Sequence, residues 1–154
     1  KDTEVIYFQG ASGFRQIQDD MLLHIKFAEP AKKDLLSFSS GTSYTKLSPL
    51  SIQRAFIRKR IKLGAWYRAI ATSDSAAIPT WTNDPTELRA IKYIAENSEF
   101  FRMEMSVYSD NVMLYSPTAP IGGVVIRNER IADSMRALFN LVWGLLPEVP
   151  GQQR

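Results

Sequence analysis

The chain has 154 residues, a hydrophobic content of 45% and a formal net charge of +3, which fits one globular domain with its own core. Cysteine is absent, so disulfides and thiolate chemistry are excluded, and the single histidine excludes any mechanism that needs two imidazoles from one subunit. No apolar run is long enough to span a bilayer and the N-terminus lacks a signal-peptide pattern, so we expect a soluble, cytoplasmic protein.

The first predicted strand is residues 4–8 (EVIYF), a β-branched and aromatic run that Gln9 and Gly10 close. Glu4, Tyr7, Gln9 and Gly10 also have the spacing of a viral protease site that is used to remove expression tags. Two origins therefore stay open, a tag remnant and a native strand. The intervening residues suit a strand, which favours native sequence.

Residues 14–28 predict a helix with one core-facing stripe, which Pro30 ends. His24 and Lys26 on this helix form a His-x-Lys tripeptide, the start of the nucleophile motif of phospholipase D-type enzymes. Position 31, where that motif needs aspartate, is alanine, and no second histidine can act as the acid. We therefore favour a surface or half-buried structural histidine over a catalytic one. The stripe consists of Phe14, Ile17, Met21, Ile25 and Ala28.

A strand-helix-strand unit occupies residues 33–72. Two apolar runs, residues 33–40 and 65–72, flank a polar loop at 41–48 and a basic helix that begins at Ser48-Pro49 and ends at Gly64. A helical crossover of this length joins parallel strands. The unit predicts an α/β fold, with a mixed, largely parallel sheet flanked by helices.

The first loop of this unit is rich in hydroxyl groups. Ligands of such sheets bind where strands run out into loops, so the sequence predicts a ligand site here. Hydroxyls donate and accept without imposing charge, which suits a polar neutral or weakly charged ligand. The alternative is that they only cap and turn the backbone. The candidates are Ser37, Ser39, Ser40, Thr42 and Ser43.

The basic helix carries five positive charges within nine residues, so the rest of the chain sums to −2. One interpretation is a solvated helix face; the other is a contact with an anion or an acidic partner through Arg54, Arg58 and Lys62. The five cations are Arg54, Arg58, Lys59, Arg60 and Lys62.

Residues 73–83 predict a loop, in which Trp81 is either a flap over a pocket or an aromatic anchor. Asp84 and Pro85 then predict the start of a short helix with Leu88, Ile91 and Ala95 facing inward and an end near Asn97.

Residues 102–108 alternate strictly and predict a half-exposed strand, which a turn at 109–111 joins to residues 112–115 in a hairpin. Residues 121–127 predict another strand. In it, Gly122 and Gly123 indicate either a bulge, which we favour, or close approach of backbone or ligand.

Asn128 predicts the cap of a last helix, residues 129–146, and residues 147–154 predict a flexible tail after a single domain of residues 1–146. Leu141, Trp143 and Leu145 widen its apolar stripe beyond what one sheet face needs, so we expect them to contact a second copy or another domain. The stripe itself is Ile131, Met135, Leu138, Phe139, Val142 and Leu146.

Several segments together resemble the C-terminal effector domain of TrmB-type transcriptional regulators, over about Val5 to Trp143. They are LLSFSSGTSY, the helix IRKRIKLG before WYRAIAT, the hairpin YSDNVMLYSP and APIGGVVIRNERIADSMRALFNLVW. The resemblance implies a phospholipase D-like fold without the enzyme's catalytic motif. In that family a winged helix-turn-helix domain precedes the effector domain, binds operator DNA and pairs with a second copy, while the effector domain senses a ligand, a sugar in the best-known members.

The implied fold extends the candidate ligand site to Thr72, Asp74 and Tyr115. Sugar-binding members carry an additional C-terminal β-rich subdomain that is not found after Trp143, so sugar specificity does not carry over. No DNA-reading domain lies within these residues, so the resemblance implies a fragment or a stand-alone relative.

We therefore expect a non-catalytic, ligand-sensing, homodimeric effector domain. It would have no catalytic residue, metal or cofactor, would contact DNA only through a separate domain and would not contact membranes. The alternatives are a phospholipase D-like phosphodiesterase acting through His24 and direct nucleic-acid binding by the basic helix.

Overall fold

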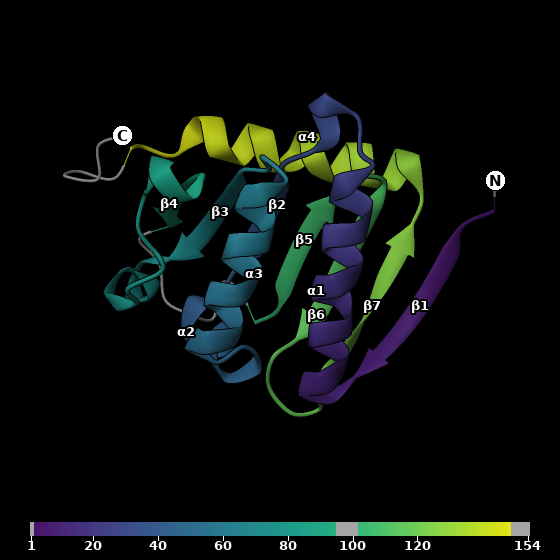
Figure 1. Cartoon of the computed structure of the whole chain (residues 1–154), viewed down its shortest axis with the longest axis horizontal. Coiled ribbons are helices and arrows are strands. Elements are labelled where there is room, and N and C mark those ends of the chain that lie inside the picture. The colour runs from purple at the N-terminus through teal and green to yellow at the C-terminus, as the bar shows by residue number, and fades with distance from the viewer. Residues whose placement is uncertain (1, 95–101, 149–154) are drawn as a thin grey trace.

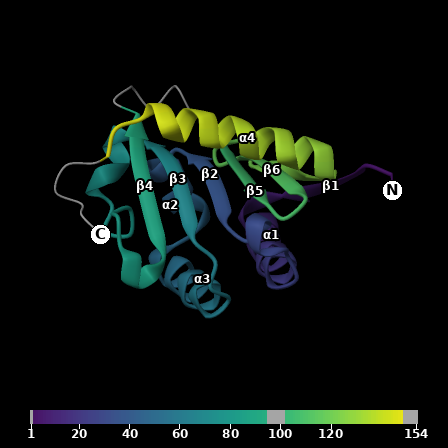
Figure 2. The ribbon, with the colours of Figure 1, turned by 90° about the horizontal axis from the view of Figure 1, so that it is seen from above.

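The computed structural model describes residues 2–94 and 102–148 and contains a seven-stranded sheet with helices on both faces (Figures 1 and 2). The strands lie side by side in the order β1-β7-β6-β5-β2-β3-β4. The strands are β1 (Glu4–Gln9), β2 (Leu35–Ser39), β3 (Tyr67–Thr72), β4 (Arg89–Ile94), β5 (Glu104–Tyr108), β6 (Asn111–Ser116) and β7 (Gly122–Arg127). The helices are α1 (Gly10–Lys26), α2 (Gly41–Leu47), α3 (Leu50–Lys62) and α4 (Glu129–Leu145).

The sheet confirms the α/β class, but the prediction that it is largely parallel was wrong. Among the strands of the described residues, only β2, β3 and β4 pair in parallel; β1 with β7, β7 with β6, β6 with β5 and β5 with β2 are antiparallel. The crossover unit behaves as predicted, because a connection that contains a helix returns the chain in the same direction. The second half uses a tight turn and a short connection, which reverse the strand direction.

The two faces of the sheet have separate cores. α1 and α3 cover one face, where Phe14, Ile17, Met21 and Ile25 of α1 are buried, and α4 covers the other (Figure 2). On the α4 face, Phe139 packs over the sheet in a cluster of buried strand residues, among them Ile70 and Val107. Each helix within the described ranges is too short or too polar to cross a membrane.

Two segments differ from the sequence prediction. The predicted polar loop at 41–48 contains the helix α2, and Pro49, with no side-chain cap, precedes α3 in place of the predicted serine cap. The predicted helix after Asp84 stops after one 3₁₀ turn (Pro85–Glu87), because Leu88 adopts a left-handed backbone with φ of 50°. The chain then continues as β4, whose backbone pairs with β3. Ala95 and Asn97 of that predicted helix, and residues 149–154 of the predicted tail, lie outside the described residues.

The hairpin β5–β6 and the strand β7 are confirmed, but β5 is buried on both faces and not half-exposed. It lies between β2 and β6 in the sheet, and α1 and α4 pack over its two faces. Gly123 resolves the alternatives for the glycine pair in favour of close approach: a Cβ there would lie 2.0 Å from the carbonyl oxygen of Leu114 on β6. Glycine is thus required by the neighbouring backbone.

The last helix begins as predicted, since the Asn128 side chain accepts a hydrogen bond from the amide of Ile131. Its outward side carries exposed leucines among polar residues: Leu141 is 62% exposed and Leu145 is 77% exposed. Trp143 instead packs within the chain, stacking on Phe139. The predicted contact surface on α4 is therefore reduced to its leucines.

Candidate functional site

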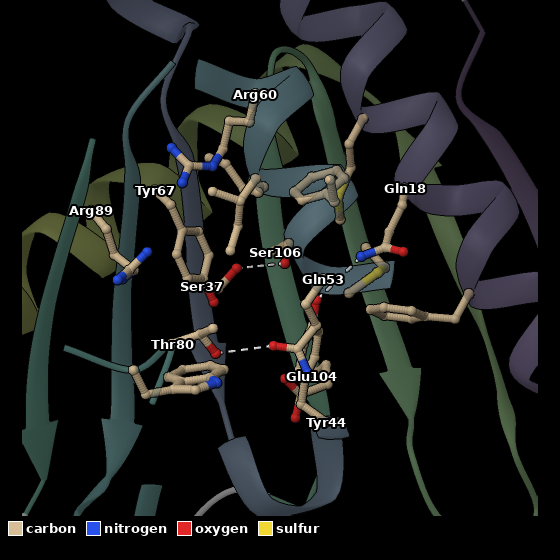
Figure 3. Close-up of a pocket in the computed structure, with 17 residues that line it drawn as sticks. Gln18, Ser37, Tyr44, Gln53, Arg60, Tyr67, Thr80, Arg89, Glu104 and Ser106 are labelled. Atoms are coloured by element: carbon tan, nitrogen blue, oxygen red, sulfur yellow. Dashed lines mark hydrogen bonds between the residues drawn. The ribbon is translucent and has the colours of Figure 1, made fainter. Parts of the chain in front are cut away.

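A narrow cavity lies between the sheet and the helices α1 and α3, close to the predicted hydroxyl site (Figure 3). Its volume is about 50 Å³. This is enough for a few water molecules, and far below the several hundred Å³ of a pocket that encloses a drug-sized ligand. Polar side chains from α1, β2, α3, β4 and β5 line it, together with residues 80 and 81 of the loop after β3.

The floor of the cavity is a serine pair on neighbouring antiparallel strands. Ser37 of β2 and Ser106 of β5 are register partners, so their side chains share one face of the sheet. Their hydroxyls form a hydrogen bond of 2.7 Å, drawn in Figure 3. The predicted site residue Ser37 thus points into the cavity rather than into a solvent-exposed loop.

Glu104, at the first position of β5, is the chemically unusual group of this site. It is 3% exposed, it accepts a short hydrogen bond from the hydroxyl of Ser39, and it accepts a 3.0 Å bond from the amide of Ser40. Among the described residues no lysine or arginine pairs with it. Burial raises the pKa of Glu104 to about 8, although the two serine hydrogen bonds act in the opposite direction. The carboxyl is therefore mostly protonated at neutral pH.

Aromatic rings close the cavity around these polar groups. Trp81 is buried and packs edge-on against Tyr44 and Tyr67, so this segment anchors to the body while its ring lines the cavity. Burial raises the pKa of Tyr44 to about 12, which keeps its hydroxyl protonated. That hydroxyl accepts a 3.2 Å hydrogen bond from Nε2 of Gln18. Trp81 is therefore an aromatic anchor of the loop, and its ring also forms part of the cavity wall.

The remaining predicted ligand residues fall into two groups beside the cavity. Thr42 and Thr72 both donate to the carboxylate of Asp74, linking the start of α2 to the end of β3. Ser40 and Ser43 face each other at 3.5 Å within the first turn of α2. Within this network the hydroxyls bond mainly to one another and to Asp74, and Ser40 makes no side-chain cap on α2.

Tyr115 lies opposite Glu104 in the β5–β6 register and therefore on the same face. Its hydroxyl donates a short hydrogen bond to the carbonyl of Gly10 at the start of α1. Tyr115 thus lies beside the site, but its hydroxyl already makes a structural hydrogen bond.

The basic helix divides its charges between two environments. Arg60 is 1% exposed and donates to three backbone carbonyls, those of Ala65 (2.7 Å), Glu87 (2.9 Å) and Leu88 (3.0 Å). Burial lowers the pKa of this guanidinium to about 10. Arg60 is therefore a structural residue at one end of the cavity, and only the other four cations face outward. Those four are Arg54, Arg58, Lys59 and Lys62.

His24 belongs to a separate polar cluster and does not line this cavity. Its Nδ1 donates to the carbonyl of Asp20, and its Nε2 lies 3.4 Å from a guanidinium nitrogen of Arg127. Arg127 holds Asp20 with two bonds of 3.0 Å, and Tyr108 donates to the same carboxylate. Burial acts to raise the pKa of Asp20, but these hydrogen bonds outweigh it and keep that pKa below its ordinary value.

Several residues of the site are not predicted from the sequence, above all Glu104 and Ser106. The alternation predicts both on the exposed side of a half-exposed strand, and the packing of α1 and α3 over that face of the sheet buries them. The polar alternation of residues 102–106 was a usable signal, because polar side chains on a strand that proves central must share a buried site. The other missed lining residues are Gln18, Gln53, Arg60, Thr80 and Arg89.

Comparison with known proteins shows likeness in structure alone. No protein-family model matches the sequence, and a search of curated proteins found no match. The chain is similar to TrmBL2, an archaeal chromatin protein whose structure shows a novel mode of DNA binding. Identity is 15% and the TM-score 0.63, over 94% of this chain and 54% of TrmBL2. The chain thus spans about half the length of that relative.

Two further similar structures match over nearly their whole length. Nuc from Salmonella typhimurium, a phospholipase D family member, is 13% identical with a TM-score of 0.64, over 96% of this chain and 99% of Nuc. NucT from Helicobacter pylori is 8% identical with a TM-score of 0.66, over 96% of this chain and 100% of NucT. The fold is phospholipase D-like, as the resemblance to TrmB-type effector domains implied.

Proposed function

We propose that this chain is a non-catalytic regulatory domain on a phospholipase D-like scaffold, which senses a small polar ligand and pairs with a second copy. The observation that carries the proposal is the composition of the central cavity. Its polar floor consists of a serine pair and a protonated carboxyl. Such groups bind by donating and accepting hydrogen bonds, and they supply no strong nucleophile.

The position of the only histidine supports the non-catalytic part of the proposal. A phosphodiesterase that attacks through imidazole needs that ring free to reach phosphorus and a second group to protonate the leaving oxygen. His24 uses Nδ1 for its own helix and faces the guanidinium of Arg127 with Nε2. A bis-p-nitrophenyl phosphate assay tests this: we expect no turnover above background. Turnover that His24→Ala abolishes would establish the phosphodiesterase instead.

The ligand-sensing part requires the cavity to widen, because about 50 Å³ does not admit a sugar-sized molecule. α2 is the wall that joins the hydroxyl network to the cavity: the amide of Gly41 donates to the hydroxyl of Ser75 at 2.9 Å, and Tyr44 packs edge-on against Trp81. A ligand that binds only the widened state would shift the population toward that state. Such a shift is how a sensor domain would transmit occupancy to a partner subunit.

A thermal-shift screen over sugars, polyols and nucleosides tests ligand binding directly. A ligand at 100 times its Kd stabilises the folded state by about 2.7 kcal/mol. For a chain of this length, that raises Tm by roughly 5–10 °C. We expect Ser37→Ala to reduce the shift and the exposed Ser51→Ala, a matched control, to leave it unchanged. A shift that survives Ser37→Ala and Ser39→Ala would place the ligand elsewhere.

The exposed leucines of α4 support pairing with a second copy. Leu138, Leu141 and Leu145 lie at spacings of three and four residues, so they form one outward apolar stripe on the helix. Sedimentation velocity from 1 to 200 µM tests the pairing. We expect a dimer in the parent chain and a monomer in Leu141→Glu/Leu145→Glu; a parent that stays monomeric over this range would refute it.

A further inference from the structure

The outer side of α3 carries a row of cations. Arg54, Arg58, Lys59 and Lys62 are exposed, and among the residues that the structure describes none of them takes part in a hydrogen bond or ion pair. Neither α2 nor α3 contains an acidic residue. α3 lies on the side of the sheet away from α4 (Figures 1 and 2). Unpaired cations grouped on one helix create a local positive potential that attracts polyanions.

We propose that this row binds the phosphate backbone of double-stranded DNA without reading its sequence. Residues four apart on a helix are displaced by about 6 Å along its axis. Phosphates of one DNA strand advance by about 3.4 Å per nucleotide, so Arg54, Arg58 and Lys62 can each reach a different phosphate. This contact lies on the domain itself, whereas the resemblance to TrmB-type regulators assigns DNA to a separate domain. It does not depend on ligand sensing.

The surrounding residues favour duplex DNA over other polyanions. Between Arg54 and Lys62 the outward face of α3 has no exposed large apolar side chain, so it lacks the apolar centre typical of a protein interface. It also has no exposed aromatic ring on which the bases of a single strand could stack. The helix's only amide side chain, Gln53, is buried and donates to the carbonyl of Ser48, so it is not available to read base edges.

Fluorescence anisotropy with two unrelated 24-base-pair duplexes, from 50 to 200 mM salt, tests the proposal on the whole chain. Four phosphate contacts predict a slope of about −3.6 in log K against log salt, which is roughly a 150-fold loss of affinity over this range. Both duplexes should bind equally. Arg54→Glu/Arg58→Glu should weaken binding at 50 mM salt by at least 10-fold and halve the slope.

Matched variants separate a local contact from an effect of net charge. Lys26→Glu/Arg130→Glu changes the charge of the chain by the same amount at exposed positions outside α3, and it should change Kd by less than threefold. Arg54→Lys/Arg58→Lys keeps the charge and should bind like the parent chain. Circular dichroism confirms that each variant is folded.

Three results would overturn the proposal. The first is a parent chain that does not bind either duplex at 50 mM salt. The second is an equal loss of affinity in the α3 variant and the matched control. The third is binding to poly-glutamate but not to DNA, which would assign the row to an acidic protein partner.

Discussion

Replacing Glu104 by glutamine should stabilise the folded chain at neutral and alkaline pH. The pKa of this carboxyl is about 8 in the folded chain against an ordinary value of 4.5, so the folded state holds the proton more tightly than the unfolded state does. The resulting stabilisation is complete below pH 4.5 and is lost as the pH rises through about 8. A loss of up to about 1.4 kcal/mol per pH unit gives about 3 kcal/mol between pH 5 and pH 8.

Glutamine can keep both hydrogen bonds: its carbonyl oxygen accepts from the amide of Ser40, and its amide nitrogen donates to the hydroxyl of Ser39, which in the parent chain donates to the carboxyl. Urea unfolding at half-unit steps from pH 5 to pH 8.5 measures the difference in free energy between Glu104→Gln and the parent. We expect it to grow by about 3 kcal/mol in favour of the variant. Glu29→Gln, at an exposed carboxyl, should show no such growth. A difference that stays constant across this range would refute the claim that the carboxyl is buried without a counter-charge.

Three further substitutions test other parts of the fold by denaturant unfolding. Gly123→Ala should destabilise by about 2 kcal/mol or more, because its Cβ would collide with the backbone of β6, whereas Gly144→Ala meets no atom within 4 Å and should stabilise α4 by about 0.5–1 kcal/mol. Arg60→Met should cost about 3 kcal/mol, since it leaves buried carbonyls unbonded, whereas Arg58→Met on the exposed side should change stability by less than about 0.5 kcal/mol. Asp20→Asn should cost about 3 kcal/mol at pH 7 by leaving a half-buried guanidinium unpaired, and the variant should lose less stability than the parent as the pH falls below 4, where the parent's aspartate becomes protonated. If Gly123→Ala were as stable as Gly144→Ala, or Arg60→Met as stable as Arg58→Met, the packing or hydrogen bonds described for Gly123 or Arg60 would be refuted. If Asp20→Asn and the parent lost stability equally below pH 4, the Asp20–Arg127 ion pair would not contribute to the folded state.

The candidate site shows where sequence patterns succeed and where they stop. The hydroxyl-rich end of the first crossover strand was found from the sequence, because a polar segment directly after an apolar run marks a strand end. Its partners on β5 were not found from the sequence, because they are distant in the chain. Glu104 is 65 residues from Ser39, and Ser106 is 69 residues from Ser37. No local pattern contains the pairing of β2 with β5.

The basic helix shows the same division within a single element. The sequence locates the cations between Arg54 and Lys62 and the glycine that follows them, because spacing and capping are local properties of the chain. Arg60 is buried because it donates to carbonyls of the turn before β4, and this turn lies beside α3 only in the assembled sheet. The same residue type therefore becomes a buried structural group at position 60 and a free surface charge at position 58.

By itself the sequence determined the α/β class, the parallel crossover of β2 and β3, the β5–β6 hairpin and the cap of α4, since each follows from periodicity and turn chemistry over a few residues. Tertiary structure alone decided that residues 89–94 form an edge strand, that most strand pairs are antiparallel and that a lone carboxyl is enclosed at the centre of the sheet. Strand pairing and burial are set by neighbours distant in the chain, and their energies outweigh the weak local preferences from which the sequence was interpreted.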